Sequence, residues 1–287
     1  MPVDDSTLLD VVLDPYVSRA AHKLIHALDE LNSVQTRRCV QDPSSPVPPS
    51  PVCPSQVPWS QVPSFQVPSS HAGSSQASSS SSSSFAQAHR RVETDSSSEA
   101  SPQVVEHRSA TKQQTLSPLV IEGAGVLDAG ASTGGFTQVL LARGAAKVYA
   151  LDVGHGQLAP VVRQDPRVVV REGLNLRDLS LADVEGVPVD LVVADVSFIS
   201  LTLLLAPLFS VLAQHGSAFF LVKPQFEVGR SALDSHGVVR DDATRARGIA
   251  AVVEAAADLG WPLAWQGDSA LPGERGNREA FCLFQRP

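Results

Sequence analysis

The sequence predicts an α/β fold with a mostly parallel sheet and an antiparallel strand pair at one edge. From Gly123 onward, apolar runs typical of buried strands alternate with helical patterns, which is the sequence form of a βαβ array. Two late apolar runs, at 263–266 and 280–285, predict the strand pair that closes the sheet. The chain of 287 residues is 43% hydrophobic, so it can bury the core of one such domain.

The first 37 residues form a predicted N-terminal segment built on one amphipathic helix. The stretch 18–31 reads SRAAHKLIHALDEL, and Ser18 is a plausible N-cap for it. The first fourteen residues contain four aspartates and no basic residue, unlike a signal peptide or an Arg-rich transit peptide. Four apolar residues recur at helical spacing: Leu24, Ala27, Leu28 and Leu31.

Residues 38–118 have a different composition. Serine and proline account for 29 of the 60 residues from 41 to 100, and a Gln-Val-Pro triplet recurs at 56, 61 and 66. Such a stretch buries too little apolar area to offset its ordering entropy, so we expect a disordered insertion. Its role stays open between a phosphorylatable or partner-binding linker and a passive insertion, including a mistranslated intron.

The remaining residues, 119–287, form the predicted catalytic domain. One uncharged run of eighteen residues, 196–213, reaches the lower limit for a membrane span. Its polar residues and Pro207 favour a loop and a helix after a buried strand, so we expect no membrane span. The runs that predict strands are GVLDAG (125–130), KVYALDVG (147–154), VDLVVADV (189–196) and AFFLVKP (218–224), and those that predict helices are FTQVLLARG (136–144) and RARGIAAVVEAAADLG (245–260).

A glycine-rich loop follows the first predicted strand. It reads DAGASTGGF (128–136) and precedes a helix, so it lies at the carboxyl end of a strand, where open α/β sheets bind ligands. Glycines allow the backbone to approach a ligand closely. The loop is neither a G-x-G-x-x-G fingerprint nor a P-loop. The predicted cofactor-binding residues in it are Asp128, Gly130, Ala131, Ser132, Thr133, Gly134, Gly135 and Phe136.

The polar residues around this loop indicate the cofactor. An opening carboxylate suits a positively charged cofactor without phosphates, and S-adenosylmethionine carries an ammonium and a sulfonium. Asp152 ends the next apolar run, 22 residues after Gly130. A carboxylate at about this spacing in the sequence is typical of one that binds the two hydroxyls of a ribose. Asn175 is a candidate for the adenine end. Each feature alone is common in proteins without a cofactor, but their order favours a Rossmann-like S-adenosylmethionine-dependent methyltransferase fold.

Asp195 and Lys223 end two further apolar runs, where the active-site crevice is expected. A lysine beside a carboxylate can have its proton affinity tuned for acid–base work, although a purely structural ion pair is also possible. The three cysteines, at 39, 53 and 282, have no metal-ligand spacing and fit a reducing compartment. We therefore expect no metal site.

Seven stretches, in order, resemble the motifs of the TlyA family. The members of this family are FtsJ-like ribosomal RNA 2′-O-methyltransferases, also called haemolysins. The resemblance covers 123–287 almost without gaps, and 16–31. The stretches are YVSRAAHKL (16–24), LDAGASTGGFT (127–137), ALDVGHGQL (150–158), DLVVADVSFISL (190–201), LVKPQFEVGR (221–230), HGVVRD (236–241) and LPGERGNREAF (271–281).

The resemblance implies a catalytic tetrad of Lys23, Asp195, Lys223 and Glu279. Lys223 would be its central group, helping to deprotonate a ribose 2′-hydroxyl or stabilising the alkoxide that develops. Asp195 would hold Lys223 and also lie beside S-adenosylmethionine, while Lys23 and Glu279 would orient the nucleotide. Positioning and electrostatics should supply most of the acceleration. The implied substrate is RNA, most naturally in a ribosomal subunit.

Two features depart from the family pattern. Family members usually begin with a small S4-type RNA-binding domain, and none precedes Tyr16. Residues 123–287 carry 14 Lys and Arg against 18 Asp and Glu, so we expect weak RNA binding, a helper protein or a missing exon. The insertion lengthens the loop before the first strand about sixfold, at a cost of about 1.6 kcal/mol, so Lys23 can still reach the site. Arginines that could line a modest groove are Arg240, Arg245, Arg247, Arg275 and Arg278.

Two other functions stay open. The chain could be a non-catalytic relic that binds the cofactor or the ribosome without turnover. It could also be a membrane-active haemolysin, although the sequence offers no basic amphipathic helix. The compartment is also open between the cytoplasm and, for a nuclear-encoded protein, a mitochondrion or plastid, although the acidic N-terminus argues against import.

Overall fold

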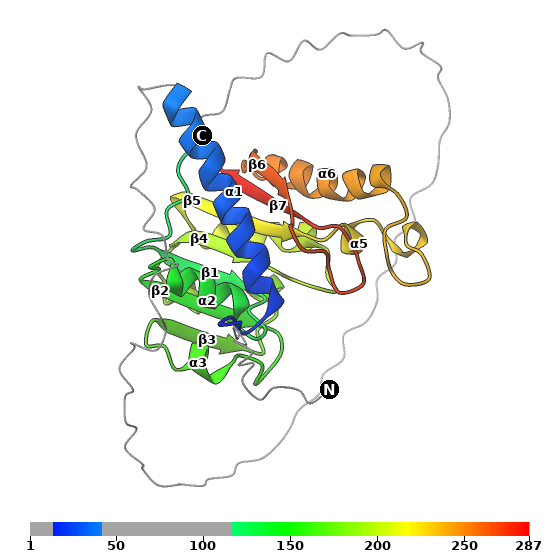
Figure 1. Cartoon of the computed structure of the whole chain (residues 1–287). Helices are drawn as coiled ribbons and strands as arrows, with labels where there is room; N and C mark the ends of the chain where they lie inside the picture. Colours follow the sequence, from blue (N-terminus) through cyan, green and yellow to red (C-terminus); the bar gives the residue numbers. More distant parts are fainter. Residues whose placement is uncertain (1–13, 42–115, 287) are drawn as a thin grey trace, which may run out of the picture. The chain divides into compact units, whose positions relative to one another are not determined.

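The computed structural model describes residues 14–41 and 116–286 of the chain. Of the predicted insertion at 38–118, residues 42–115 lie outside the described residues, so their predicted disorder stays a prediction. Residues 38–41 continue the helix that begins at Arg19, so the predicted start of the insertion at residue 38 is wrong. Figure 1 shows the described elements along the sequence, from the N-terminal helix to the last strand.

A seven-stranded sheet forms the centre of the described region, in the order β3-β2-β1-β4-β5-β7-β6 (Figure 1). Strands β1 to β5 run parallel, whereas β7 is antiparallel to both β5 and β6. The predicted α/β fold with an antiparallel edge is therefore confirmed. The strands are β1 (Gly125–Ala129), β2 (Lys147–Asp152), β3 (Val168–Glu172), β4 (Val189–Ala194), β5 (Leu212–Val222), β6 (Leu263–Asp268) and β7 (Ala280–Gln285).

The strand order reverses between β1 and β4. The chain runs from β1 outward through β2 to β3 and then returns to place β4 on the other side of β1. At the ends of these two strands, the Asp195 backbone N–H donates to the Ala129 carbonyl at 3.0 Å. Beyond this bond, the segments that follow β1 and β4 separate. Such a switch point opens a crevice at the carboxyl ends of the strands, where ligands bind in this class of sheet.

The helices cover both faces of the sheet. They are α1 (Arg19–Gln41), α2 (Gly135–Ala142), α3 (Pro160–Arg163), α4 (Leu205–Ser210), α5 (Pro224–Glu227) and α6 (Asp242–Asp258), with 3-10 turns η3 (Leu176–Asp178), η4 (Leu181–Val184), η5 (Leu201–Leu203) and η6 (Arg230–Ala232). None of the helices within 14–41 and 116–286 is long and apolar enough to cross a membrane. The uncharged run 196–213 forms a loop, η5, α4 and the first residues of β5, as expected except for the strand.

Each face of the sheet has its own hydrophobic core, because successive strand residues point to opposite faces. Val126 of β1 packs with residues of α1 and α2, whereas the next residue, Leu127, packs with residues of α4 and α6. The four residues of α1 at helical spacing are all buried in the first of these cores. The predicted amphipathic helix is therefore confirmed, and it docks on the domain even though the insertion separates them in sequence.

Ser18 immediately precedes α1 but does not cap it. Its hydroxyl has no hydrogen-bond partner, so the predicted capping bond is wrong. The side chain instead packs against the start of α2, where a Cβ added at Gly135 would lie 2.2 Å from the Ser18 Oγ. Close helix packing therefore takes the place of the cap.

Candidate active site

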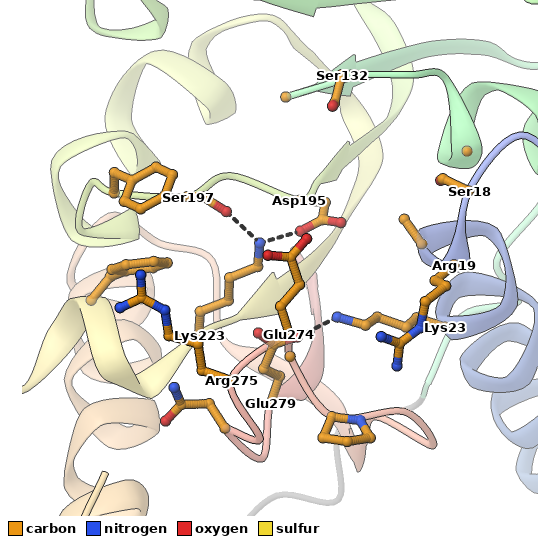
Figure 2. Close-up of a pocket in the computed structure, with 18 of the residues that line it drawn as sticks. Ser18, Arg19, Lys23, Ser132, Asp195, Ser197, Lys223, Glu274, Arg275 and Glu279 are labelled. Carbon is orange, nitrogen blue, oxygen red and sulfur yellow. Dashed lines mark hydrogen bonds and ion pairs between the residues drawn. The ribbon is translucent and has the colours of Figure 1, made fainter. Parts of the chain in front are cut away.

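A cavity of about 540 Å³ opens at the carboxyl ends of the central strands. Six parts of the chain line it: the start of α1, the loop between β1 and α2, the segment that follows β4, the segment that follows β5, Gly237, and the loop before β7. Figure 2 shows charged side chains entering it from several of these parts. The cavity therefore lies in the crevice that the strand order creates.

The glycine-rich loop forms one wall of the cavity. Gly130 has φ +83°, and a Cβ there would lie 2.8 Å from the Asp195 carbonyl oxygen. Only glycine fits this combination of a left-handed backbone and a close approach to the end of β4. Six of the eight predicted cofactor-binding residues in this loop line the cavity: Gly130, Ala131, Ser132, Thr133, Gly135 and Phe136.

Asp128 is not part of that wall, which corrects the interpretation of its carboxylate as a direct cofactor contact. The residue is fully buried and accepts a hydrogen bond from the Thr137 hydroxyl at 2.6 Å. Burial raises the pKa of the Asp128 carboxyl to about 7, and the charge of Asp195 adds to this effect. Asp128 therefore lies beneath the loop, where it links the end of β1 to α2.

Asp152, Gly134 and Asn175 also do not line the cavity. Asp152 accepts backbone hydrogen bonds from Ser132 at 2.8 Å and Gly154 at 2.7 Å, so it fixes the loop against the end of β2. Gly134 precedes α2 with φ +97°, and a Cβ there would meet Leu158 at 2.8 Å. Asn175 is exposed and caps η3 through the Arg177 backbone N–H. The first two support the loop, whereas Asn175 has a local role.

Lys223 and Asp195 form an ion pair at the bottom of the cavity. The Lys223 Nζ lies 2.6 Å from the Asp195 Oδ1, and it donates a hydrogen bond to the Ser197 Oγ at 2.7 Å (Figure 2). An ammonium has three N–H groups, and one of them donates to Ser197, so donor capacity remains for a ligand. The predicted pairing of Lys223 with Asp195 is present in the structure.

Lys23 and Glu279 form a second ion pair, on the other side of the cavity (Figure 2). The Lys23 Nζ lies 2.7 Å from the Glu279 Oε2, and the two residues are only 9% and 2% exposed. Gln225 donates to the other Glu279 oxygen at 3.2 Å. The four residues that the family resemblance implies as a tetrad thus come together around one cavity from α1, β4, β5 and β7.

A buried amide secures the chain in front of α1. Gln138 of α2 accepts from the Val17 backbone N–H at 2.9 Å and donates to the Pro15 carbonyl at 2.9 Å. This two-bond contact fixes where α1 begins, and with it the approach of Lys23 to the cavity. The packing of Ser18 against Gly135 acts at the same point.

Besides Arg275, the rim of the cavity carries groups that the sequence analysis did not single out. Phe198 is 90% exposed with φ +65°, and its ring lies 5.5 Å from that of Phe226. Arg19 and Arg275 line the cavity (Figure 2), and neither forms an ion pair within the part of the chain that the structure describes. Ser197 and Phe198 lie inside a motif used for the family resemblance, but their roles depend on the loop conformation.

The other arginines proposed for a groove are mostly engaged elsewhere. Arg245 and Arg278 both pair with Asp268, and Arg278 also pairs with Asp242. Arg240 and Arg247 donate hydrogen bonds to the Leu233 carbonyl and the Thr244 hydroxyl. Of the five, Arg275 is the one that lines the cavity. Among the described residues, no three His, Cys, Asp or Glu side chains gather as a metal site would require.

Comparison with known proteins decides the family. The profile of the FtsJ-like methyltransferase family matches residues 108–286, more than half of the chain. The chain belongs to this family. Among its FtsJ-like relatives, the 16S/23S rRNA (cytidine-2′-O)-methyltransferase TlyA of Mycobacterium tuberculosis is 52% identical over 167 residues, which cover 58% of this chain and 62% of that protein. Hemolysin A of Brachyspira hyodysenteriae is 39% identical over 164 residues, or 57% and 68% of the two chains.

A solved structure is similar to this chain in both fold and sequence. The crystal structure of a candidate hemolysin from Lactococcus lactis matches with a TM-score of 0.57 and 43% identity, covering 59% of this chain and 81% of that one. The chain spans less than two thirds of the length of the Mycobacterium tuberculosis relative.

Proposed function

We propose that this chain transfers a methyl group from S-adenosylmethionine to a ribose 2′-hydroxyl of RNA, with ribosomal RNA as the substrate. One observation carries the proposal: Lys223 is held by an ion pair with Asp195 and a hydrogen bond to Ser197, with donor capacity left for a ligand, opposite the Lys23–Glu279 pair. Ribosomal RNA is proposed because the 52% identical relative is named as an enzyme that methylates it.

The wall of the cavity fits S-adenosylmethionine. Gly130 lines the cavity with bare backbone and packs too closely on the Asp195 carbonyl to carry a Cβ. The carboxylate of Asp195 lies on the cavity surface, where it suits a positively charged ligand. Ser132 is held in place by Asp152. S-adenosylmethionine would supply an activated methyl group, and residues 130–136 with Asp195 would hold it.

The polar residues then act on the ribose oxygen. A free N–H of Lys223 donates to the 2′-oxygen and stabilises the negative charge that develops on it as the hydroxyl proton passes to solvent water. Asp195 and Ser197 keep the lysine aimed, so little reorganisation is needed. Removing one such preorganised donor typically lowers turnover by a factor of about 100 to 1,000. Lys23 and Glu279 form a rigid opposite wall, which orients the nucleotide.

The rim of the cavity supports an RNA substrate. An exposed aromatic ring offers a face on which an unpaired base can stack, worth roughly 1–3 kcal/mol per base, and Phe198 presents such a ring. Arg19 and Arg275 can neutralise flanking phosphates. With so few free cations at the cavity, we propose that a helper protein or a further RNA-binding domain supplies additional affinity.

The test uses the purified chain, ribosomal subunits and S-adenosylmethionine with a tritiated methyl group. After alkaline digestion, label is expected in dinucleotides that resist cleavage, because a 2′-O-methyl group removes the nucleophile for RNA hydrolysis. Nuclease digestion then identifies the labelled nucleoside. Label in base-methylated nucleosides, or none although calorimetry shows cofactor binding, contradicts the proposal.

A further inference from the structure

We propose that Glu227 is a positioning residue of this site: its carboxylate clamps the loop between β4 and η5, which carries Asp195 and Ser197, to the helical turn that follows Lys223. The role in catalysis rests on the function proposed above. Glu227 does not line the cavity and lies outside the tetrad, so its effect on the reaction would be exerted through the loop.

Glu227 holds the far end of this loop with both of its oxygens. The Oε1 accepts from the Leu201 backbone N–H at 2.8 Å, and the Oε2 accepts from the Ser200 hydroxyl at 2.5 Å. The residue is half-buried, and burial raises the pKa of its carboxyl, while its bonds to the loop favour the charged form. A partly desolvated carboxylate is retained where hydrogen bonds compensate for the lost water, as they do here.

The loop needs such a clamp because of its conformation. Phe198 adopts φ +65°, a region that bulky residues rarely occupy. The strand β4 ends at Ala194 and η5 begins at Leu201, so regular secondary structure does not fix the residues between. A side chain that grips the loop where η5 starts restricts the positions available to Ser197 and Phe198.

The turn that carries Glu227 also fixes Lys223. Lys223 immediately precedes α5, and Glu227 is the last residue of that turn. The Phe226 backbone N–H donates to the Lys223 carbonyl at 2.9 Å, which keeps the two ends of the turn in register. The turn therefore binds the loop at two places. Lys223 contacts the start of the loop, at Asp195 and Ser197, and Glu227 contacts its end, at Ser200 and Leu201.

This arrangement links Glu227 to the rate of methyl transfer. If the loop moves relative to α5, the distances from Lys223 to Asp195 and Ser197 change together. A displacement of about 1 Å at a reacting group can cost about a hundredfold in rate. Within the described residues, Glu227 bonds to Ser200 and Leu201 and not to residues 130–136, which form most of the wall that would hold S-adenosylmethionine. The cofactor affinity should therefore change much less than the rate.

The experiment compares Glu227→Gln, Ser200→Ala and the double variant with the full chain, using Glu254→Gln as a control. Glutamine keeps the size of the side chain but turns one acceptor into a donor that faces Ser200. Glu254 is an exposed glutamate of α6, so its variant reports the general effect of removing a carboxylate. Single-turnover methyl transfer, S-adenosylmethionine affinity and backbone amide exchange at 197–202 are measured for each.

Glu227→Gln is expected to slow methyl transfer by about tenfold to a hundredfold, with a much smaller change in S-adenosylmethionine affinity. Amide exchange at Leu201 should become faster. The double variant should be little worse than Glu227→Gln alone, because both changes break the same contact. Glu254→Gln should match the wild type throughout.

Unchanged exchange at Leu201, or faster exchange with an unchanged rate, overturns the proposal. If Glu227→Gln does not fold, Ser200→Ala is used instead, because it removes only the hydroxyl that Glu227 binds. It should also slow methyl transfer and speed amide exchange at Leu201, both to a smaller extent. A wild-type chain that transfers no methyl group contradicts the proposed function instead, while the exchange comparison still decides whether the clamp exists.

Discussion

Burial at the end of β1 gives Asp128 a titration that falls in the neutral range. Its carboxyl is fully buried, and desolvation, with the nearby charges of Asp195 and Asp152, raises its pKa to about 7 against the bond from Thr137. Near neutral pH, the loop that begins with Asp128 therefore carries less negative charge in the folded chain than the sequence alone indicates. A charge argument from sequence fails here because it assumes solvent exposure.

The raised pKa of Asp128 predicts a pH-dependent stability. Between about pH 3.8 and pH 7 the folded state binds a proton that the unfolded state has released, so this carboxyl contributes stability at low pH that is lost as pH rises through about 7. Asp128→Asn keeps an acceptor for Thr137 and removes the titration. The free energy of unfolding of the variant, relative to wild type, should therefore rise from pH 5 to pH 8 in urea titrations. Parallel pH profiles for the two proteins would show that Asp128 does not titrate as described.

Gly135 sets how closely α1 approaches the cavity. A Cβ at this position would lie 2.2 Å from the Ser18 Oγ and 3.0 Å from the Ala21 nitrogen, so Gly135→Ala should displace the start of α1 and slow methyl transfer at least about tenfold. Adding Ser18→Ala should restore part of the rate. The matched control is Gly125→Ala, whose Cβ would meet nothing nearer than 3.8 Å. Equal rates for both glycine variants would contradict this role of α1.

The secondary-structure elements were largely predictable from sequence because their signals are local. Apolar runs and helical spacing depend on neighbouring residues, and the strands and α1 follow them. The Ser18 cap was wrong because packing against α2 determines where that side chain lies. A contact with a distant helix leaves no mark in the local sequence.

The candidate site was predictable in part. Asp195 and Lys223 each end a parallel strand, and such ends meet at one edge of the sheet, so their pairing could be expected. Lys23 and Glu279 depended on the family resemblance. Ser197 and Glu227 were missed because their contacts depend on how α5 faces the loop, which no periodicity encodes.

The docking of α1 predicts that core residues distant from the cavity affect catalysis. Leu28 is buried between α1 and the domain, and its truncation to alanine should cost about 2–5 kcal/mol of packing. Leu28→Ala should therefore slow methyl transfer more than it weakens S-adenosylmethionine binding, because Lys23 is carried by α1. His26→Ala, at an exposed position of the same helix, should leave both unchanged. If folded Leu28→Ala protein transferred the methyl group at the wild-type rate, the packing of α1 on the domain would not be needed for catalysis.

At the scale of the whole molecule, the charge distribution limits the interaction with RNA. The chain has a formal net charge of −8, and two arginines at the cavity, Arg19 and Arg275, have no ion-pair partner in the described ranges. Because phosphate neutralisation supplies much of RNA affinity, this chain by itself should bind weakly and depend for selectivity on the shape of the cavity.

This charge distribution predicts a shallow salt dependence. Two phosphate contacts on a single strand give a slope of about −1.4 in log affinity against log salt, or roughly sevenfold between 50 and 200 mM salt. Filter binding of an rRNA fragment measures it, and Arg275→Ala should lower the slope by about 0.7. A loss of several hundredfold over that range would indicate an RNA surface far larger than the cavity rim.

The central claim is that Lys223 acts on the ribose hydroxyl and not on the cofactor. The most direct measurement compares wild type with Lys223→Met, which keeps an unbranched side chain of similar length, in two assays: S-adenosylmethionine binding by calorimetry and single-turnover transfer of a tritiated methyl group to ribosomal subunits. We predict affinities within about twofold and a rate at least about a hundredfold lower in the variant. A variant that transfers the methyl group at the wild-type rate would contradict this account.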